Sequence, residues 1–279
     1  MKQPKAETVL KRRFISYCTP LKIARDWGRD NGAEYREQAL ILLEGLFEQY
    51  PHAIEIAEEL ALSYLEGNDD VRAQAVLDEI QLLSRSPHEE VLARRGRIFR
   101  DKADHFVTYP VYVGPPEVKI GGPFENLAEA LRYFKLALEQ YTQSYEIRLG
   151  HYPGVNVATL NLLIAAFTSE AGERTERLEK CRSTAKQVIS RRQNWPRDYD
   201  DDDVWHAASA GEMQLLLQDW PAALENYRHA QAHAKCKAFH RTSMLKQVIR
   251  IIYGYMRLGV TSLGAFDKLT NVFPPDSAE

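Results

Sequence analysis

The sequence predicts an all-α protein, built as a solenoid of helical hairpins with one irregular inserted loop. Residues 20–53 and 54–87 form two consecutive 34-residue blocks that place small and apolar residues at matching offsets. Later segments return to the same pattern after an interruption. The chain has 279 residues, of which 44% are hydrophobic, so it can bury a continuous core.

The matching offsets are those of a tetratricopeptide repeat, a 34-residue pair of antiparallel helices. A small residue is needed where the two helices approach most closely, and a proline ends the second helix by removing a backbone donor. The pattern comprises Ala39, Leu43, Leu46 and Pro51 in the first block and Ala73, Leu77, Ile80 and, two places late, Pro87 in the second.

The first helix, over residues 21–30, begins after Pro20 and matches the repeat offsets poorly, as terminal repeats often do. An amphipathic helix follows over residues 34–49. The second hairpin begins after Pro51 and turns at residues 67–70. A third hairpin opens at Glu89, so the first hundred residues read as stacked repeats.

Residues 107–124 interrupt the third hairpin with four prolines and three glycines, which oppose continued helix. Ala130, Phe134 and Ala137 then resume the repeat, so the loop adds about 23 residues to the expected spacing. Two interpretations stay open. The loop either forms a small hairpin that patches a groove, or it contacts a ligand.

Helices are expected next over residues 127–148, 157–167 and 173–194, with a turn at Pro153 and Gly154 and an acidic turn at residues 194–203. The repeat pattern returns in Ala207, Ala210, Gly211, Ala223, Tyr227 and Ala230. A helix over residues 242–258 and a short one over 263–270 would cap the stack. The predicted organisation is a basic arm (1–19), one helical-repeat domain (20–272) and a polar tail (273–279).

Composition indicates a soluble cytoplasmic protein. The net charge is −3, with both signs interspersed, so neither nucleic acid nor a membrane surface is an expected partner. The three cysteines have no C-x-x-C spacing, which fits reduced thiols better than disulfides. We find neither a signal-peptide core nor the roughly 20 apolar residues that span a bilayer.

Residues 129–167 resemble the core of the TRAF-binding domain of apoptosis signal-regulating kinases and its stand-alone prokaryotic relatives. The run Tyr152-Pro153-Gly154-Val155-Asn156, followed by Ala158-Thr159-Leu160, carries most of the likeness. Residues 94–106 and 205–230 add to it, so it extends over about residues 50–235. The resemblance implies a regulatory helical domain that recruits signalling proteins, hence a scaffold or sensor. None of the protein-kinase motifs is present.

His229, His233, Cys236 and His240 follow one another at spacings of 4, 3 and 4 in one predicted helix. Two histidines at i and i+4 can chelate zinc, but four residues that span about 16 Å cannot share one ion. Solvated flank residues are the alternative. Cys181 and Cys236 lack any motif that pairs them with a base. We therefore predict no metal site, no catalytic residue and no cofactor.

The first helices of such hairpins line the concave groove of a solenoid, where an extended peptide or helix can bind. Here one helix offers an acidic wall and the next a basic one. The predicted partner-binding residues are Glu55, Glu58, Leu62, Arg97, Arg100, Asn156, Thr159 and Trp205. The expected function is a non-enzymatic protein-interaction scaffold or regulatory module of a signalling or defence pathway. The alternatives are a sensor that closes the 107–124 loop over a nucleotide-like ligand, and an enzyme that uses zinc or a reactive thiol.

Overall fold

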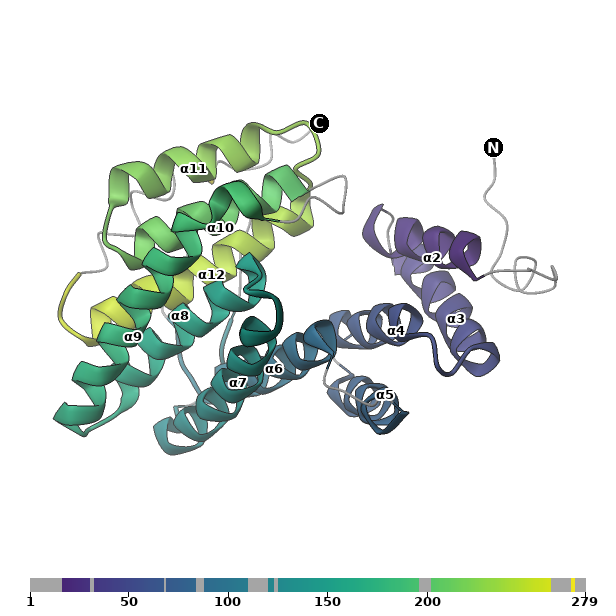
Figure 1. The fold of residues 1–279 in the computed structure, drawn as a ribbon, viewed down its shortest axis with the longest axis horizontal. Helices are drawn as coiled ribbons and strands as arrows, with labels where there is room; N and C mark the ends of the chain where they lie inside the picture. The colour runs from purple at the N-terminus through teal and green to yellow at the C-terminus, as the bar shows by residue number, and fades with distance from the viewer. Residues whose placement is uncertain are drawn as a thin grey trace. The chain divides into compact units, whose positions relative to one another are not determined.

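The computed structural model describes residues 17–30, 33–67, 69–83, 88–109, 120–122, 125–195, 202–261 and 272–273. These residues form eleven α-helices and one short 3-10 helix, and no strand, so the all-α prediction is confirmed (Figure 1). In chain order the helices are α2 (Cys18–Asp30), α3 (Ala33–Gln49), α4 (Ile54–Glu66), α5 (Asp70–Leu83), α6 (Glu89–Asp104), α7 (Leu127–Arg148), α8 (His151–Phe167), α9 (Ala171–Ser190), η1 (Arg192–Asn194), α10 (Asp202–Leu216), α11 (Trp220–Ala232) and α12 (Ala238–Arg257).

The chain forms two compact units, residues 1–98 and 99–279, with the boundary inside α6. The predicted division into an arm, one domain and a tail stays a prediction. Two observations bear on its edges. Helix α2 already begins at Cys18, and Phe273, the first residue of the predicted tail, is fully buried.

Unit 1 consists of the hairpins α2–α3 and α4–α5 and the first part of α6. The small residues expected at the close approach of each hairpin, Ala39 and Ala73, are buried, which confirms the repeat offsets. Asp69 starts α5 by accepting a hydrogen bond from the backbone N–H of Arg72 at 3.0 Å. Packing of small residues and capping of helix starts therefore account for this part of the solenoid.

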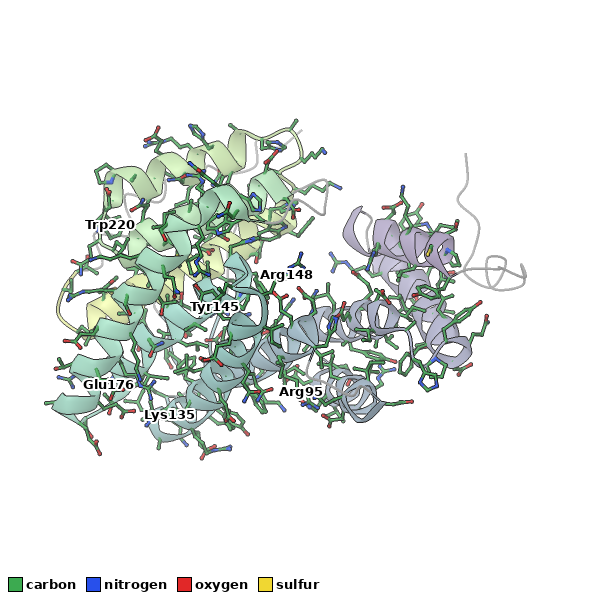
Figure 2. The ribbon with its side chains drawn as sticks, viewed as in Figure 1. Arg95, Lys135, Tyr145, Arg148, Glu176 and Trp220 are labelled. Atoms are coloured by element: carbon green, nitrogen blue, oxygen red, sulfur yellow. The ribbon has the colours of Figure 1, made fainter. Side chains whose placement is uncertain are left out.

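Unit 2 is organised around α8, which packs against α7, α9, α10 and α12. Fourteen of its 17 residues are buried. A helix that is apolar on every side must be covered on every side, and α8 is the central helix of this unit. Polar side chains join the helices that surround it, as between α7 and α9, where Lys135 and Glu173 form an ion pair at 2.8 Å; Lys135 is labelled in Figure 2.

The predicted turn at Pro153 and Gly154 is wrong, because both residues lie in the first turn of α8. Proline is tolerated there since the first N–H groups of a helix have no partner within it. The chain reverses earlier, at Leu149, which has a φ of 55° and ends α7 in the left-handed conformation.

The predicted single helix through the four histidine and cysteine positions is also wrong. Helix α11 ends at Ala232 and α12 begins at Ala238. The two histidines beside this turn are used to shape it. His233 Nδ1 accepts a hydrogen bond from the N–H of Lys235, and His240 Nδ1 accepts one from the N–H of Lys237.

The ends of the inserted loop are anchored on unit 2. Thr108 pairs with Gly121, and the N–H of Gly122 donates to the carbonyl of Val107 at 2.9 Å. Val107 and Tyr109 are buried. Residues 110–119, the acidic run 196–201 and the predicted helix 263–270 lie outside the described residues. In the part of the chain that the structure describes, no helix is long and apolar enough to cross a membrane.

Candidate functional site

The eight predicted partner-binding residues fall into two groups. Glu55, Glu58, Leu62 and Arg97 belong to unit 1, whereas Arg100, Asn156, Thr159 and Trp205 belong to unit 2. Nothing tests their contact with a partner, which stays a prediction. Their surroundings differ greatly, however, and this difference determines where a partner has access.

In unit 1, helix α4 presents Glu55, Glu58 and Leu62 at spacings of three and four, which puts them on one face. Glu55 is exposed and accepts a hydrogen bond from the Tyr17 hydroxyl at 3.3 Å. Leu62 is partly buried, as is Arg97 on α6. This face thus combines accessible charge with some apolar surface.

Glu58 is the most constrained member of this group. Its carboxylate lies 2.9 Å from Nδ1 of His88, and the Glu58 side chain is only 12% exposed. Burial raises the pKa of Glu58. The hydrogen-bonding contact with Glu58 raises the pKa of His88. The two side chains lie within ion-pair distance of each other between α4 and the start of α6.

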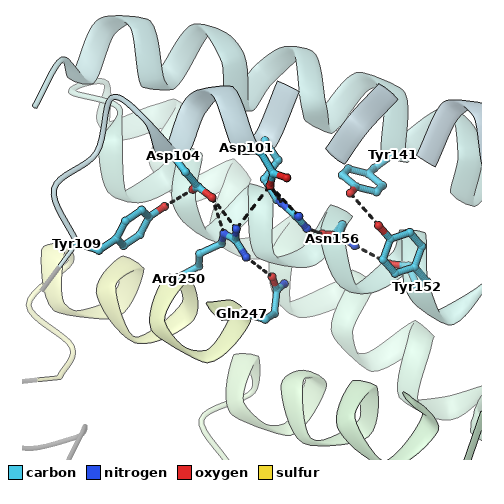
Figure 3. A network of polar contacts seen from close by, with 9 residues as sticks. Asp101, Asp104, Tyr109, Tyr141, Tyr152, Asn156, Gln247 and Arg250 are labelled. Carbon is cyan, nitrogen blue, oxygen red and sulfur yellow. Dashed lines mark hydrogen bonds and ion pairs between the residues drawn. The ribbon is translucent and has the colours of Figure 1, made fainter. Parts of the chain in front are cut away.

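In unit 2, Arg100 belongs to a polar network with Asp101 and Asn156, both of which are labelled in Figure 3. Its Nη1 donates to Oδ1 of Asn156 at 2.9 Å, and its Nε and Nη2 donate to Asp101 at 3.1 and 2.9 Å. Asn156 in turn donates to the carbonyl of Tyr152. The structure therefore brings Arg100 and Asn156 together, as a contact between α6 and α8.

Arg250 of α12 forms the second half of the network. Its Nε and Nη2 donate to Oδ2 of Asp104 at 3.0 and 2.5 Å, and the Tyr109 hydroxyl donates to Oδ1 of the same carboxylate at 2.7 Å. Arg250 also donates to Gln247, whose amide donates to Oγ1 of Thr159 at 2.8 Å. The network consequently ties α6, α8, α12 and the start of the inserted loop together.

Two of the predicted partner-binding residues that form hydrogen bonds in this network are also buried. Asn156 is 3% exposed and Thr159 is 1% exposed. Trp205 is partly buried, with its ring 4.8 Å from that of His240 and 6.3 Å from that of Phe239. Of the group in unit 2, only Trp205 thus lies outside the network, beside the exposed ring of Phe239.

Sequence reasoning missed Asp104, Gln247 and Arg250. A signal was present, because Lys246, Gln247 and Arg250 interrupt an otherwise apolar stretch from Met244 to Tyr255, and Gln247 and Arg250 are buried. Polar residues on the buried side of an apolar helix need partners. The sequence does not reveal that Asp104 is the partner of Arg250, because the two residues are 146 positions apart in the chain.

Glu212 of α10 is a further buried acid, only 8% exposed. Among the described residues it has no hydrogen-bond or ion-pair partner. Burial raises its pKa to about 8, although Arg100 and Arg250 act in the opposite direction. The carboxyl group is therefore largely protonated at neutral pH.

The chain was compared with family models, curated proteins and solved structures. A family model described as Tetratricopeptide Repeats-Sensor matches residues 34–161, from α3 into α8. No curated protein and no solved structure matches. The match supports a tetratricopeptide-like family, and such repeats generally serve as non-catalytic scaffolds for protein interaction. The likeness to the TRAF-binding domains of the kinases is not confirmed.

Protonation of Glu212 predicts a specific pH dependence of stability. Between the unfolded pKa near 4.5 and the folded value of about 8, the folded state binds more protons than the unfolded state. The free energy of unfolding therefore falls as pH rises, by up to about 1.4 kcal/mol per pH unit from this group. Urea unfolding at pH 5.5, 7 and 8.5 should show a smaller decline for Glu212→Gln than for the native chain. Equal declines, or the same effect in the exposed-site control Glu225→Gln, would exclude Glu212 as the cause.

Proposed function

We propose that this chain is a non-enzymatic interaction module of a cytoplasmic signalling or defence pathway. A partner peptide or helix would bind to the face of unit 1 that carries Glu55, Glu58, Leu62 and Arg97. The proposal rests on one observation above all. The first helix of the second hairpin presents two acids and a leucine on one face, in a repeat whose first helices form binding surfaces in solenoids.

The chemistry of this face defines the partner that fits it. Glu55 is exposed, so it can pair with a cation of the partner without any rearrangement of the core. Leu62 adds apolar area, which supplies affinity, whereas charges mainly set register and speed of association. Arg97 offers the opposite charge on α6. A segment with both basic and acidic residues around an apolar anchor matches this set.

The polar network of unit 2 favours unit 1 as the binding unit. The side chains of Arg100, Asn156 and Thr159 already form hydrogen bonds with other helices of their own unit. A partner that used them would have to break buried hydrogen bonds, each worth about 1 kcal/mol or more. Glu55 of unit 1, in contrast, is exposed, so a partner can reach its carboxylate without breaking a buried contact.

Affinity purification of the tagged chain from its native cells, with mass spectrometry, tests this proposal. The variants are Glu55→Lys and Arg97→Glu, with Glu79→Lys as the control, an equal charge reversal at an exposed site on α5. We expect a stoichiometric protein that Glu79→Lys retains and the other two variants lose. If all three variants capture the same proteins, the face on α4 and α6 is not the binding surface.

A sensor for a nucleotide-like ligand is the second candidate. It is favoured by the direct bond from Tyr109, at the start of the inserted loop, to Asp104 in the network, together with the word sensor in the description of the matching family. Ligand contact at the loop could thus reach α12 through Asp104 and Arg250. Thermal melting with a nucleotide panel should show a ligand-dependent rise in Tm that Tyr109→Phe reduces. Melting curves that no nucleotide changes would rule this candidate out.

A further inference from the structure

The first turn of α8 has backbone donors without partners. Gly150 precedes the helix in an extended conformation and no side chain caps it. Pro153 has no N–H, and the N–H of Gly154 donates to the carbonyl of Gly150. The N–H groups of His151 and Tyr152 therefore remain, and among the described residues neither has an acceptor. Such groups at a helix start attract anions.

Two buried side-chain donors lie against the same turn, and this observation is independent of the helix end. The indole N–H of Trp195 and the hydroxyl of Tyr145 have no hydrogen-bond partner in the described part of the chain, although each residue is only 6% exposed. Buried donors are nearly always satisfied in native proteins. Two unpaired donors at one helix end therefore indicate a missing acceptor.

Ring contacts place both side chains at the turn. The Trp195 ring stacks on that of His151 with centroids 4.9 Å apart. Tyr145, labelled in Figure 2, lies against Gly154, since a Cβ atom on that glycine would be 2.8 Å from its Cε2. The glycine lets the phenol ring approach the helix this closely. Side chains from α7 and from the residue after η1 thus lie beside the first turn of α8.

The local charge also favours an anion. Arg191, directly after α9, is close enough for its charge to lower the pKa of Tyr145, although burial has the larger, opposite effect. Within the described residues Arg191 forms no ion pair. His151 adds no charge, because burial and the neighbouring His206 lower its pKa to about 3. Within the part of the chain that the structure describes, the site is therefore rich in donors, and the positive side chain of Arg191 lies near it.

We propose that the first turn of α8 binds the oxyanion group of a small molecule, a phosphate or a carboxylate. The N–H groups of His151 and Tyr152, the indole of Trp195 and the hydroxyl of Tyr145 are the donors, and Arg191 balances the charge. This site lies in unit 2 and does not depend on the partner surface proposed for unit 1.

Thermal melting and tryptophan fluorescence of the full chain test this site with inorganic phosphate as the probe, at constant ionic strength. We expect Tm to rise with the logarithm of phosphate concentration above Kd, by roughly 2 °C at ten times Kd, and a saturable fluorescence change whose midpoint gives the same Kd. Because Trp195→Phe removes a fluorophore, its Kd is measured from the Tm shift alone. Tyr145→Phe removes one donor and keeps the ring, whereas Trp195→Phe removes one donor and keeps a smaller aromatic side chain. These two variants and Arg191→Gln should each raise the Kd about tenfold. A parallel titration with acetate distinguishes a carboxylate ligand from a phosphate ligand.

Arg182→Gln is the matched control, because it removes an exposed cation from α9, the helix that Arg191 follows, nine residues before Arg191. It should leave the midpoint unchanged. The proposal is overturned if neither anion gives a saturable fluorescence change with a matching rise in Tm, because water then satisfies these donors. It is also overturned if Arg191→Gln and Arg182→Gln respond alike, since the shift is then a general effect of anions on the surface.

Discussion

The buried ion pair between Arg250 and Asp104 is the interaction on which the arrangement of unit 2 depends. Taking both charges out of water is costly, and their attraction repays that cost only when the remaining donors and acceptors are satisfied. Here Tyr109 and Gln247 supply those hydrogen bonds. Forming the pair therefore positions α12, the end of α6 and the start of the inserted loop at the same time.

This pair complements the packing of the repeats. Small residues such as Ala130 and Ala223 let the helices within each hairpin approach, which explains the hairpins themselves. They do not determine where the last helix goes. Helix α12 packs on α8 and α10, and its bonds to Asp104 and Thr159 specify its register there. The same bonds withdraw Thr159 from the solvent, so the surfaces open to a protein partner and the polar interior are different parts of the molecule.

Much of the fold could be predicted from the sequence because its determinants are local. The span of α7 was predicted at residues 127–148, as observed, since Asn126 caps its start and the periodic pattern ends at Arg148. The turn was misplaced to Pro153 because proline also suits a first helical turn. The single helix predicted through His229, His233 and His240 was wrong because His233 and His240 accept hydrogen bonds from nearby backbone N–H groups in a turn. Helical periodicity in the sequence does not reveal such bonds. The network was missed because it joins positions far apart in the chain.

A double-mutant cycle on Asp104 and Arg250 measures this pair most directly. Urea unfolding would be compared for the native chain, Asp104→Ala, Arg250→Ala and the double variant. Arg250→Ala leaves the buried Asp104 carboxylate without its ion-pair partner and should cost about 3–5 kcal/mol. Asp104→Ala should cost somewhat less, because Asp101 remains 3.7 Å from Arg250. The double variant should cost at least about 1 kcal/mol less than the sum of the two. Costs that add to within about 0.5 kcal/mol would contradict the central role given to this ion pair.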